Sequence, residues 1–266
     1  LERLASVVQT YALDTAPGID SATVRQWVPE IPNLEKWFSP MVVAELACIR
    51  RLITELTEGR SRDIASLALS RIIVRVSNQD SETRYVAKEK NLLPRFTIRA
   101  FLDSLQAIQR RVEQFSDLNT LGEARFFTGD SRHVMADDIA PESVGLIVTS
   151  PPYPNATDYH LYHRFRIFWL GFDPRLLGEV EIGSHLKHQR KQSGFAEYID
   201  DMVAVLRHCH RVLSAGRYAV LIVGDAVFGG ETIDTAAGLA KAATEIGFEH
   251  VATVERPIHA PRRSFS

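Results

Sequence analysis

The stretch Val144–Tyr153 constrains the fold of this chain more than any other part of the sequence. It opens with a short apolar run, Val144–Val148, which is rich in branched residues and suits a buried central strand. Two consecutive prolines, Pro151 and Pro152, then end the run, because proline has no N–H to give to a strand ladder. The prolines therefore follow the carboxyl end of the strand, which is the edge where ligands bind in open α/β sheets.

Strand and helix patterns alternate from residue 124 onwards. The sequence predicts four strands and two main helices, with a short helix or turn at 131–140: strands at 124–128, 144–148, 218–223 and 248–254, and helices at 198–213 and 232–246. Strands separated by helices predict an α/β fold with a mostly parallel, doubly wound sheet. Three of these strands end in small or acidic residues, so their carboxyl ends are expected to line one polar crevice: Gly129 and Asp130, Ser150, and Gly224 and Asp225.

The first half of the chain has helical patterns instead. After a helix and loop in residues 1–26, apolar residues recur at helical spacing and predict helices at 41–56, 62–76 and 96–115. Ser39 and Pro40 have the pattern of a helix start. The predicted division is an N-terminal helix and loop (1–29), a helical subdomain (30–117) and an α/β half (118–266). The helical subdomain is equally consistent with a packing layer that carries no chemistry.

Charge and composition exclude several classes of protein. A net charge of −2 argues against a protein that coats nucleic acid without specificity, although it is compatible with a local basic groove. No apolar run approaches the ~20 residues of a membrane helix. The two cysteines, Cys48 and Cys209, lie far apart, which disfavours a disulfide framework and indicates a cytoplasmic setting. The nine histidines lack zinc-finger spacing, so no metal is expected.

The Pro-Pro-Tyr corner suggests a binding site. Prolines fix φ, so the loop is stiff and its carbonyls point in set directions next to the ring of Tyr153. A rigid array of acceptors beside an aromatic face suits a flat ligand with an amino group, such as a nucleobase. A tripeptide of this kind is more often a surface turn or a proline-rich ligand of a small adaptor domain. The apolar run in front of it favours a site.

A family resemblance is carried by Thr149–Tyr153, whose sequence is Thr-Ser-Pro-Pro-Tyr. It resembles the catalytic loop of the DNA amino-methyltransferases, which methylate the exocyclic amine of cytosine (N4) or adenine (N6) with S-adenosylmethionine. The resemblance continues through Asn155, Asp158 and Tyr159 into residues 163–172. It implies that residues 118–266 are the catalytic half of a Rossmann-like methyltransferase domain with an incomplete sheet. The serine form of the loop is similar to the cytosine-N4 branch, and the aspartate form to the adenine-N6 branch.

The chemistry of amine methylation suggests a role for each residue of the loop. The Ser150 hydroxyl and the Pro151 carbonyl are expected to accept hydrogen bonds from the amine, which favours a pyramidal nitrogen and stabilises its developing positive charge. Pro152 stiffens the corner, and Tyr153 is expected to stack on the base. A base inside a duplex cannot reach such a pocket, so it has to be flipped out of the helix.

The resemblance also implies a cofactor side to the site. It places Asp130 near the adenine of S-adenosylmethionine, with Gly129 and Thr149 beside it; a turn aspartate or a helix cap is the alternative for Asp130. The family's glycine-rich loop, Phe-x-Gly-x-Gly, is absent, and the pair at 229–230 follows a late strand. Because the chain also begins at Leu1 and not at methionine, we expect it to be part of a longer protein.

Three groups of basic residues are candidates for contact with DNA phosphates. Solvated surface charge is an equally good reading of each group taken singly. Their positions around one rim of the predicted sheet favour DNA. The groups are Arg164 and Arg166 with His163; Lys187, Arg190 and Lys191; and Arg256, Arg262 and Arg263.

Two classes of function follow from the sequence. The first is a DNA cytosine-N4 methyltransferase of a restriction–modification or defence system. A cognate restriction endonuclease is a candidate partner of such an enzyme. Adenine N6 is the alternative base, and an RNA base stays open. The second is a non-catalytic nucleic-acid-binding fragment of the same fold. Binding that ignores S-adenosylmethionine would distinguish the second class from the first.

Overall fold

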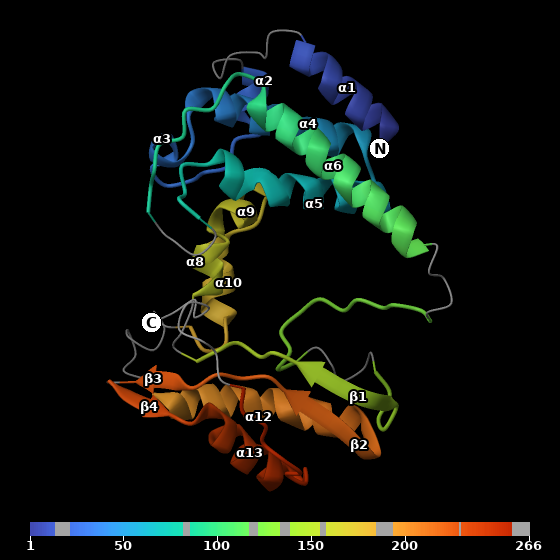
Figure 1. Ribbon diagram of the computed structural model, residues 1–266, viewed down its shortest axis with the longest axis vertical. Helices are drawn as coiled ribbons and strands as arrows, with labels where there is room; N and C mark the ends of the chain where they lie inside the picture. The colour runs from blue at the N-terminus through green and yellow to red at the C-terminus, as the bar shows by residue number, and fades with distance from the viewer. Residues whose placement is uncertain are drawn as a thin grey trace. The chain divides into compact units, whose positions relative to one another are not determined.

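The chain divides into two compact units in a computed structural model (Figure 1). The first unit contains Leu1–Glu123 and His160–Pro174, and the second contains Ala124–Tyr159 and Arg175–Ser266. The residues that the structure describes are 1–13, 22–81, 86–116, 122–133, 139–154, 158–184, 194–228 and 230–256.

The first unit is helical, as the spacing of its apolar residues predicts. The predicted helices at 41–56, 62–76 and 96–115 are confirmed as α4, α5 and α6. Pro40 occupies the first turn of α4, but the side chain of Ser39 makes no capping hydrogen bond. The helices of this unit are α1 (Glu2–Leu13), α2 (Ala22–Arg25), α3 (Leu34–Trp37), α4 (Pro40–Leu56), α5 (Gly59–Val76), α6 (Phe96–Ser116) and α9 (Arg164–Trp169).

A buried carboxylate fixes the start of α6 against α4. Glu45 of α4 is 2% exposed and accepts hydrogen bonds from the backbone N–H of Arg95 (2.7 Å) and of Thr97 (3.2 Å). The first N–H groups of a helix have no partner within the helix and carry partial positive charge, so a carboxylate there is stabilising. Arg95 itself has φ +68, which turns the chain into the helix.

We call residues 150–158, between β1 and α8, the diproline loop. The segment that follows it in sequence packs in the helical unit. Phe165 and Trp169 of α9 are buried in the same core as α4, α5 and α6. Phe38 meets both rings edge-on, with centroid distances of 5.3 Å to Phe165 and 5.8 Å to Trp169. The chain leaves the second unit at α8 (Tyr159–Tyr162) and returns to it through α10 (Pro174–Val180). The compact units therefore differ from the predicted division, which kept 118–266 together.

The second unit is a mixed α/β structure with a small parallel sheet, in agreement with the predicted α/β class. The predicted strand at 144–148 is confirmed as β1 (Val144–Thr149), which pairs in parallel with β2 (Leu213–Leu221). A hairpin of β3 (Ala226–Phe228) and β4 (Glu231–Ile233) follows. The two long helices of the unit are α12 (Phe195–Val212) and α13 (Thr235–Ile246).

Two predicted strands are wrong. Residues 124–128 and 248–254 do not form strands, and each segment exposes large apolar side chains, with Phe126 92% and Val254 90% exposed. Both segments have the composition of strands, but a strand is stable only when a neighbour completes its hydrogen bonds. Neither segment has such a neighbour among the described strands. The doubly wound order of the sheet accordingly stays a prediction.

The boundaries of two other elements also differ from the prediction. β2 begins at Leu213, five residues before the predicted strand, because the chain passes through Gly216 at φ +70 in an irregular start to the ladder. α13 begins at Thr235 and not at residue 232, because Asp234 caps it by accepting a hydrogen bond from the N–H of Ala237 at 2.8 Å.

The two faces of the β1–β2 pair are covered unequally. On one side, Leu221 and Val223 pack against a core formed by α12 and α13. The ribbon shows both helices next to β2 (Figure 1). On the other side, the paired residues Leu146 and Tyr218 are 57% and 61% exposed. Val148 and Val220, the next such pair, are also exposed. Parallel sheets normally have both faces buried.

In the described part of the chain, no helix is long and apolar enough to cross a membrane.

Candidate functional site

The diproline loop begins where the parallel ladder ends. The carbonyl of Thr149, the last residue of β1, accepts a hydrogen bond from the N–H of Ile222 at 2.9 Å. Ser150 follows at once and is exposed, whereas Pro151 and Pro154 are buried. The loop is thus held by its prolines, and its serine stands in solvent at the carboxyl edge of the sheet.

The hydroxyls of Ser150 and Tyr153 lie 3.1 Å apart, so one donates a hydrogen bond to the other. Tyr153 is half-buried and Ser150 is exposed. When the Ser150 hydroxyl donates to the Tyr153 oxygen, both lone pairs of the Ser150 oxygen are left to accept hydrogen bonds from a ligand. This arrangement supplies the acceptor beside an aromatic ring that the sequence predicts.

The polar edge at β1 and β2 has two strand ends and not the three that the sequence predicts. Thr149 and Leu221 are partners in the register, so Ser150 and the Gly224–Asp225 pair follow the same edge of the sheet. Gly129 and Asp130 do not follow a strand, because residues 124–128 form none.

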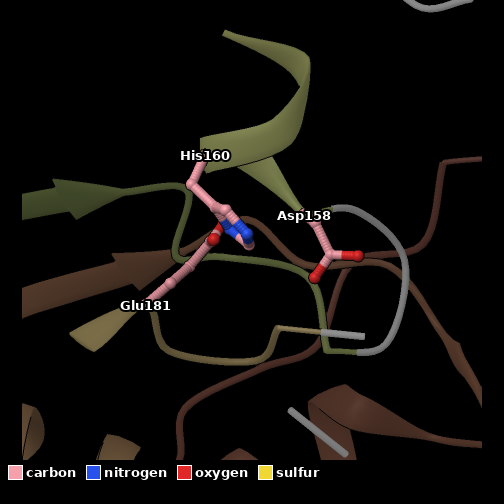
Figure 2. Close-up of side chains that lie close together, drawn as sticks. All are labelled: Asp158, His160 and Glu181. Carbon is pink, nitrogen blue, oxygen red and sulfur yellow. The ribbon is translucent and has the colours of Figure 1, made fainter. Parts of the chain in front are cut away.

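The far end of the loop is fixed by two acidic side chains. Asp158, 9% exposed, accepts a hydrogen bond from the Ser184 hydroxyl at 2.6 Å. Glu181 accepts one from the backbone N–H of Tyr159 at 2.6 Å. Figure 2 shows both carboxylates close to the start of α8. The third side chain in that view, His160, is the first residue of the segment that belongs to the helical unit.

Two tyrosines near this end of the loop, Tyr159 and Tyr198, have raised pKa values. Burial raises the pKa of the Tyr159 hydroxyl, and smaller effects of Tyr153 and Glu181 add to the shift, while a backbone hydrogen bond of Tyr153 opposes it. Burial also raises the pKa of Tyr198, which is fully buried, and Tyr159 adds to that shift. Both phenols are therefore neutral at physiological pH, and neither is suited to act as a base.

Asp130, the predicted cofactor residue, is engaged in an ion pair. Its carboxylate accepts hydrogen bonds from the Arg132 side chain at 2.7–3.1 Å and from the Arg132 backbone N–H at 2.9 Å. Arg132 in turn binds Asp201 of α12 at 2.7 Å and the carbonyl of Val180 at 2.9 Å. Asp130 thus ties its turn to α12.

This ion pair predicts a dependence of stability on pH. The side-chain hydrogen bonds of Arg132 lower the pKa of Asp130 to about 2, from an ordinary value of ~4. A lowered pKa in the folded state stabilises the protein above the ordinary value, and this stabilisation is lost as the pH falls from ~4 through about 2. We expect the difference in urea midpoint between the wild type and Asp130→Asn to shrink between pH 7 and pH ~2. An unchanged difference would contradict the ion pair. Asp225→Asn, an exposed carboxylate outside the pair, is the control.

The basic residues predicted to bind DNA fall into two groups. Arg164 and Arg166 lie in the first unit and make contacts there. The Arg164 guanidinium lies over the rings of Trp37 (4.7 Å) and Phe165 (4.4 Å), and burial lowers its pKa to about 10. Arg166 donates to the Ser70 carbonyl at 3.1 Å. Their contact with DNA stays a prediction. His163 and Arg256 are also described and are exposed. The remaining predicted DNA-binding residues lie outside the described part of the chain: Lys187, Arg190, Lys191, Arg262 and Arg263. Asn155 of the family resemblance also lies outside it.

Comparison with known proteins gives one informative similarity. Residues of this chain are 27% identical over 218 positions to the Type II methyltransferase M.MjaII of Methanocaldococcus jannaschii. The similarity is to a methyltransferase. It covers 73% of this chain but only 41% of that protein, so the chain spans about two fifths of its relative's length. No family model matches the chain, and no solved structure matches it. The similarity supports the methyltransferase resemblance of Thr149–Tyr153. It does not distinguish cytosine from adenine as the methylated base, and the prediction of cytosine depends on Ser150 alone.

Asp130 and Thr149, assigned to the methyl donor together with Gly129, have partners within the chain, and the contact of these residues with S-adenosylmethionine stays a prediction. The Asp130 carboxylate is occupied by Arg132, and the Thr149 carbonyl by the ladder. Gly129 begins the turn that carries the ion pair, and no strand leads into it.

Sequence reasoning missed the residues that hold the loop. No role was assigned to Glu181, Ser184 or Tyr198, because their contacts are with residues far away in sequence. Only Gly183, in the short Ile182–Ser184 stretch, gave a signal, since an isolated glycine often marks a turn or a close approach of two backbones.

Proposed function

We propose that the protein is an S-adenosylmethionine-dependent DNA methyltransferase that modifies the N4 amine of a flipped-out cytosine. The proposal rests chiefly on the exposed Ser150 hydroxyl, placed 3.1 Å from the Tyr153 hydroxyl at the carboxyl edge of β1. The similarity to a Type II methyltransferase supports the class of reaction. S-adenosylmethionine is the methyl donor that this class implies.

The loop would act on the nucleophile. The lone pair of a cytosine amine is delocalised into the ring, so the amine is a weak nucleophile. The Ser150 oxygen and the Pro151 carbonyl accept hydrogen bonds from its two N–H groups, which draws the nitrogen towards a pyramidal geometry and stabilises the charge that forms on it. The Tyr153 ring, half-buried beside them, stacks on the base. In a direct displacement the new N–C bond would form as the methyl–sulfur bond of the donor breaks, the donor would leave as a neutral thioether, and the methylated nitrogen would release one proton to solvent. Positioning and charge stabilisation supply the rate, and no covalent intermediate with the enzyme is needed.

The test is the identity of the methylated base. The protein expressed from its natural gene is incubated with labelled S-adenosylmethionine and, in parallel reactions, with unmethylated DNA or with RNA, and the nucleosides are separated by mass spectrometry. We expect N4-methylcytosine, with none formed when the donor is omitted. Formation of N6-methyladenine alone would show that adenine, and not cytosine, is the base that is methylated. Label in RNA but not in DNA would show that RNA is the substrate.

A second candidate is a nucleic-acid-binding unit of the same fold that does not bind the methyl donor. The ion pair of Asp130 with Arg132 favours it, because that carboxylate was the cofactor residue that the resemblance implied. This candidate predicts DNA binding that S-adenosylmethionine leaves unchanged and no incorporation of labelled methyl groups. A cognate restriction endonuclease, in a restriction–modification system, is a further proposal that belongs to the first candidate.

A further inference from the structure

A short turn lies directly against the diproline loop, although it is more than twenty residues away in sequence. This turn, residues 181–184, contacts the loop at three points. Glu181 accepts a hydrogen bond from the Tyr159 N–H, and the Ser184 hydroxyl donates one to Asp158, both at 2.6 Å. Between them, Gly183 lies against Pro154. The turn thus touches the residue just after Tyr153 and the residues that lead into α8.

Gly183 permits the backbone contact with Pro154. Its φ is +77, a backbone conformation that side chains disfavour. A Cβ at this position would lie 3.3 Å from the Pro154 Cα, 3.4 Å from the Tyr198 ring and 3.6 Å from the Tyr153 carbonyl oxygen. The backbones of turn and loop therefore approach each other where only glycine fits without strain.

The turn is itself fixed by the core of the second unit. Ile182 is 8% exposed and packs in one cluster with Tyr198, Met202, Leu206 and Leu239 of α12 and α13. Ser184 is 1% exposed. A turn held in this way transmits the rigidity of two long helices to a loop that would otherwise be tied down only by its prolines.

The two hydrogen bonds serve groups that need them. Asp158 is almost fully buried, and a buried carboxylate is costly unless it accepts hydrogen bonds. The Tyr159 N–H is the first of α8 and has no partner within its own helix. Loss of either bond would favour an open arrangement, in which water replaces the turn and the loop moves away from it.

We propose that Glu181, Gly183 and Ser184 are positioning residues that hold the diproline loop with Ser150 and Tyr153 in the geometry for methyl transfer. This inference rests on the proposed function. None of the three side chains has to touch the base or the donor. Their effect is on the orientation of Ser150 and Tyr153, and hence on the rate of the bound complex more than on the affinity for the donor.

The test uses matched variants of Glu181 and two readouts. Glu181→Gln keeps an oxygen that accepts from the Tyr159 N–H, and Glu181→Ala removes it. The control is Glu179→Ala, an exposed carboxylate two residues away. The first readout, hydrogen exchange of the Tyr159 amide, needs no catalytic activity. The second is kcat and KM for methyl transfer, with thermal unfolding to confirm the fold.

We expect the Tyr159 amide to exchange about tenfold faster or more in Glu181→Ala, because a hydrogen bond to a charged acceptor contributes on that order to the closed state. Exchange in Glu181→Gln and Glu179→Ala should stay near the wild-type rate. In Glu181→Ala, kcat should fall by roughly tenfold with KM for the donor unchanged, less than the ~10²-fold cost of a 1 Å misplacement. Ser184→Ala should lower kcat in the same way, and Ser184→Thr should restore part of it.

Each unexpected result has a separate meaning. Unchanged Tyr159 exchange in Glu181→Ala would overturn the inference, whether or not the protein transfers methyl groups. Faster exchange with an unchanged kcat would also overturn it, because the turn would then hold the loop without serving the reaction. Absence of methyl transfer by the wild type would instead count against the proposed function, and it would be visible before any variant is made.

Discussion

Replacement of Ser150 by alanine is expected to lower kcat/KM for methyl transfer by ~10²–10³-fold, the usual cost of removing one group that stabilises a developing charge. Ser150 is exposed, and its hydroxyl makes a hydrogen bond with Tyr153 at the surface, so the fold should lose little. Surface substitutions of this kind change the free energy of unfolding by ~0.5 kcal/mol or less, which shifts the melting temperature by about 2 °C. Incorporation of labelled methyl groups measures the rate, and calorimetry the melting temperature.

The matched control for Ser150 is Ser143→Ala. Ser143 is also an exposed serine of the second unit with a single surface hydrogen bond, to the Ala140 carbonyl at 2.6 Å, but it precedes β1 and does not follow it. It should keep the wild-type rate. If Ser150→Ala retained more than about a third of the wild-type rate, the serine would not be the acceptor and the assignment of the base would lose its support.

Replacement of Tyr153 should separate the ring from the hydroxyl. Tyr153→Ala is expected to lower kcat/KM by about 10²-fold, because stacking of an aromatic ring on a base contributes ~1–3 kcal/mol. Tyr153→Phe keeps the ring and loses only the hydrogen bond with Ser150, so it should stay within about tenfold of the wild type. Steady-state kinetics with a DNA substrate of many sites measures both variants.

Tyr218→Ala is the control for the tyrosine variants, because Tyr218 is an exposed tyrosine of the same unit, 61% exposed, on the open face of the sheet. Equal losses in Tyr153→Phe and Tyr153→Ala would show that the hydroxyl, and not the ring, is the functional group. Stacking would then have no part in the mechanism, and the Ser150–Tyr153 hydrogen bond would be its centre.

Local patterns predicted the elements that are stabilised locally. The helices α4, α5 and α6 follow from apolar residues at 3.6-residue spacing, because each helix makes its own hydrogen bonds and needs only one apolar face. β1 was found because its apolar run is ended sharply by Pro151 and Pro152. The exposed position of Ser150 follows from the same two prolines, because they end the strand and the loop therefore begins at the edge of the sheet.

Contacts between distant segments could not be predicted in this way. Residues 124–128 and 248–254 have the composition of strands, but composition does not reveal whether a partner strand is present. The carboxylate of Asp130 was assigned to a cofactor from the family resemblance alone. The sequence does not reveal its ion pair with Arg132, which also binds Asp201 about seventy positions further on. The turn at 181–184 lacked any motif, because its function depends on which backbone it approaches.

The unequal covering of the sheet has a practical consequence for handling the protein. The uncovered face exposes a nearly continuous apolar stripe to water, formed by Leu146, Val148, Tyr218 and Val220. Sulfate and phosphate strengthen the tendency of such surface to leave water, whereas urea weakens it. We therefore expect precipitants based on those two anions to promote self-association through this stripe, and dilute, low-salt buffers with a low concentration of urea to reduce it.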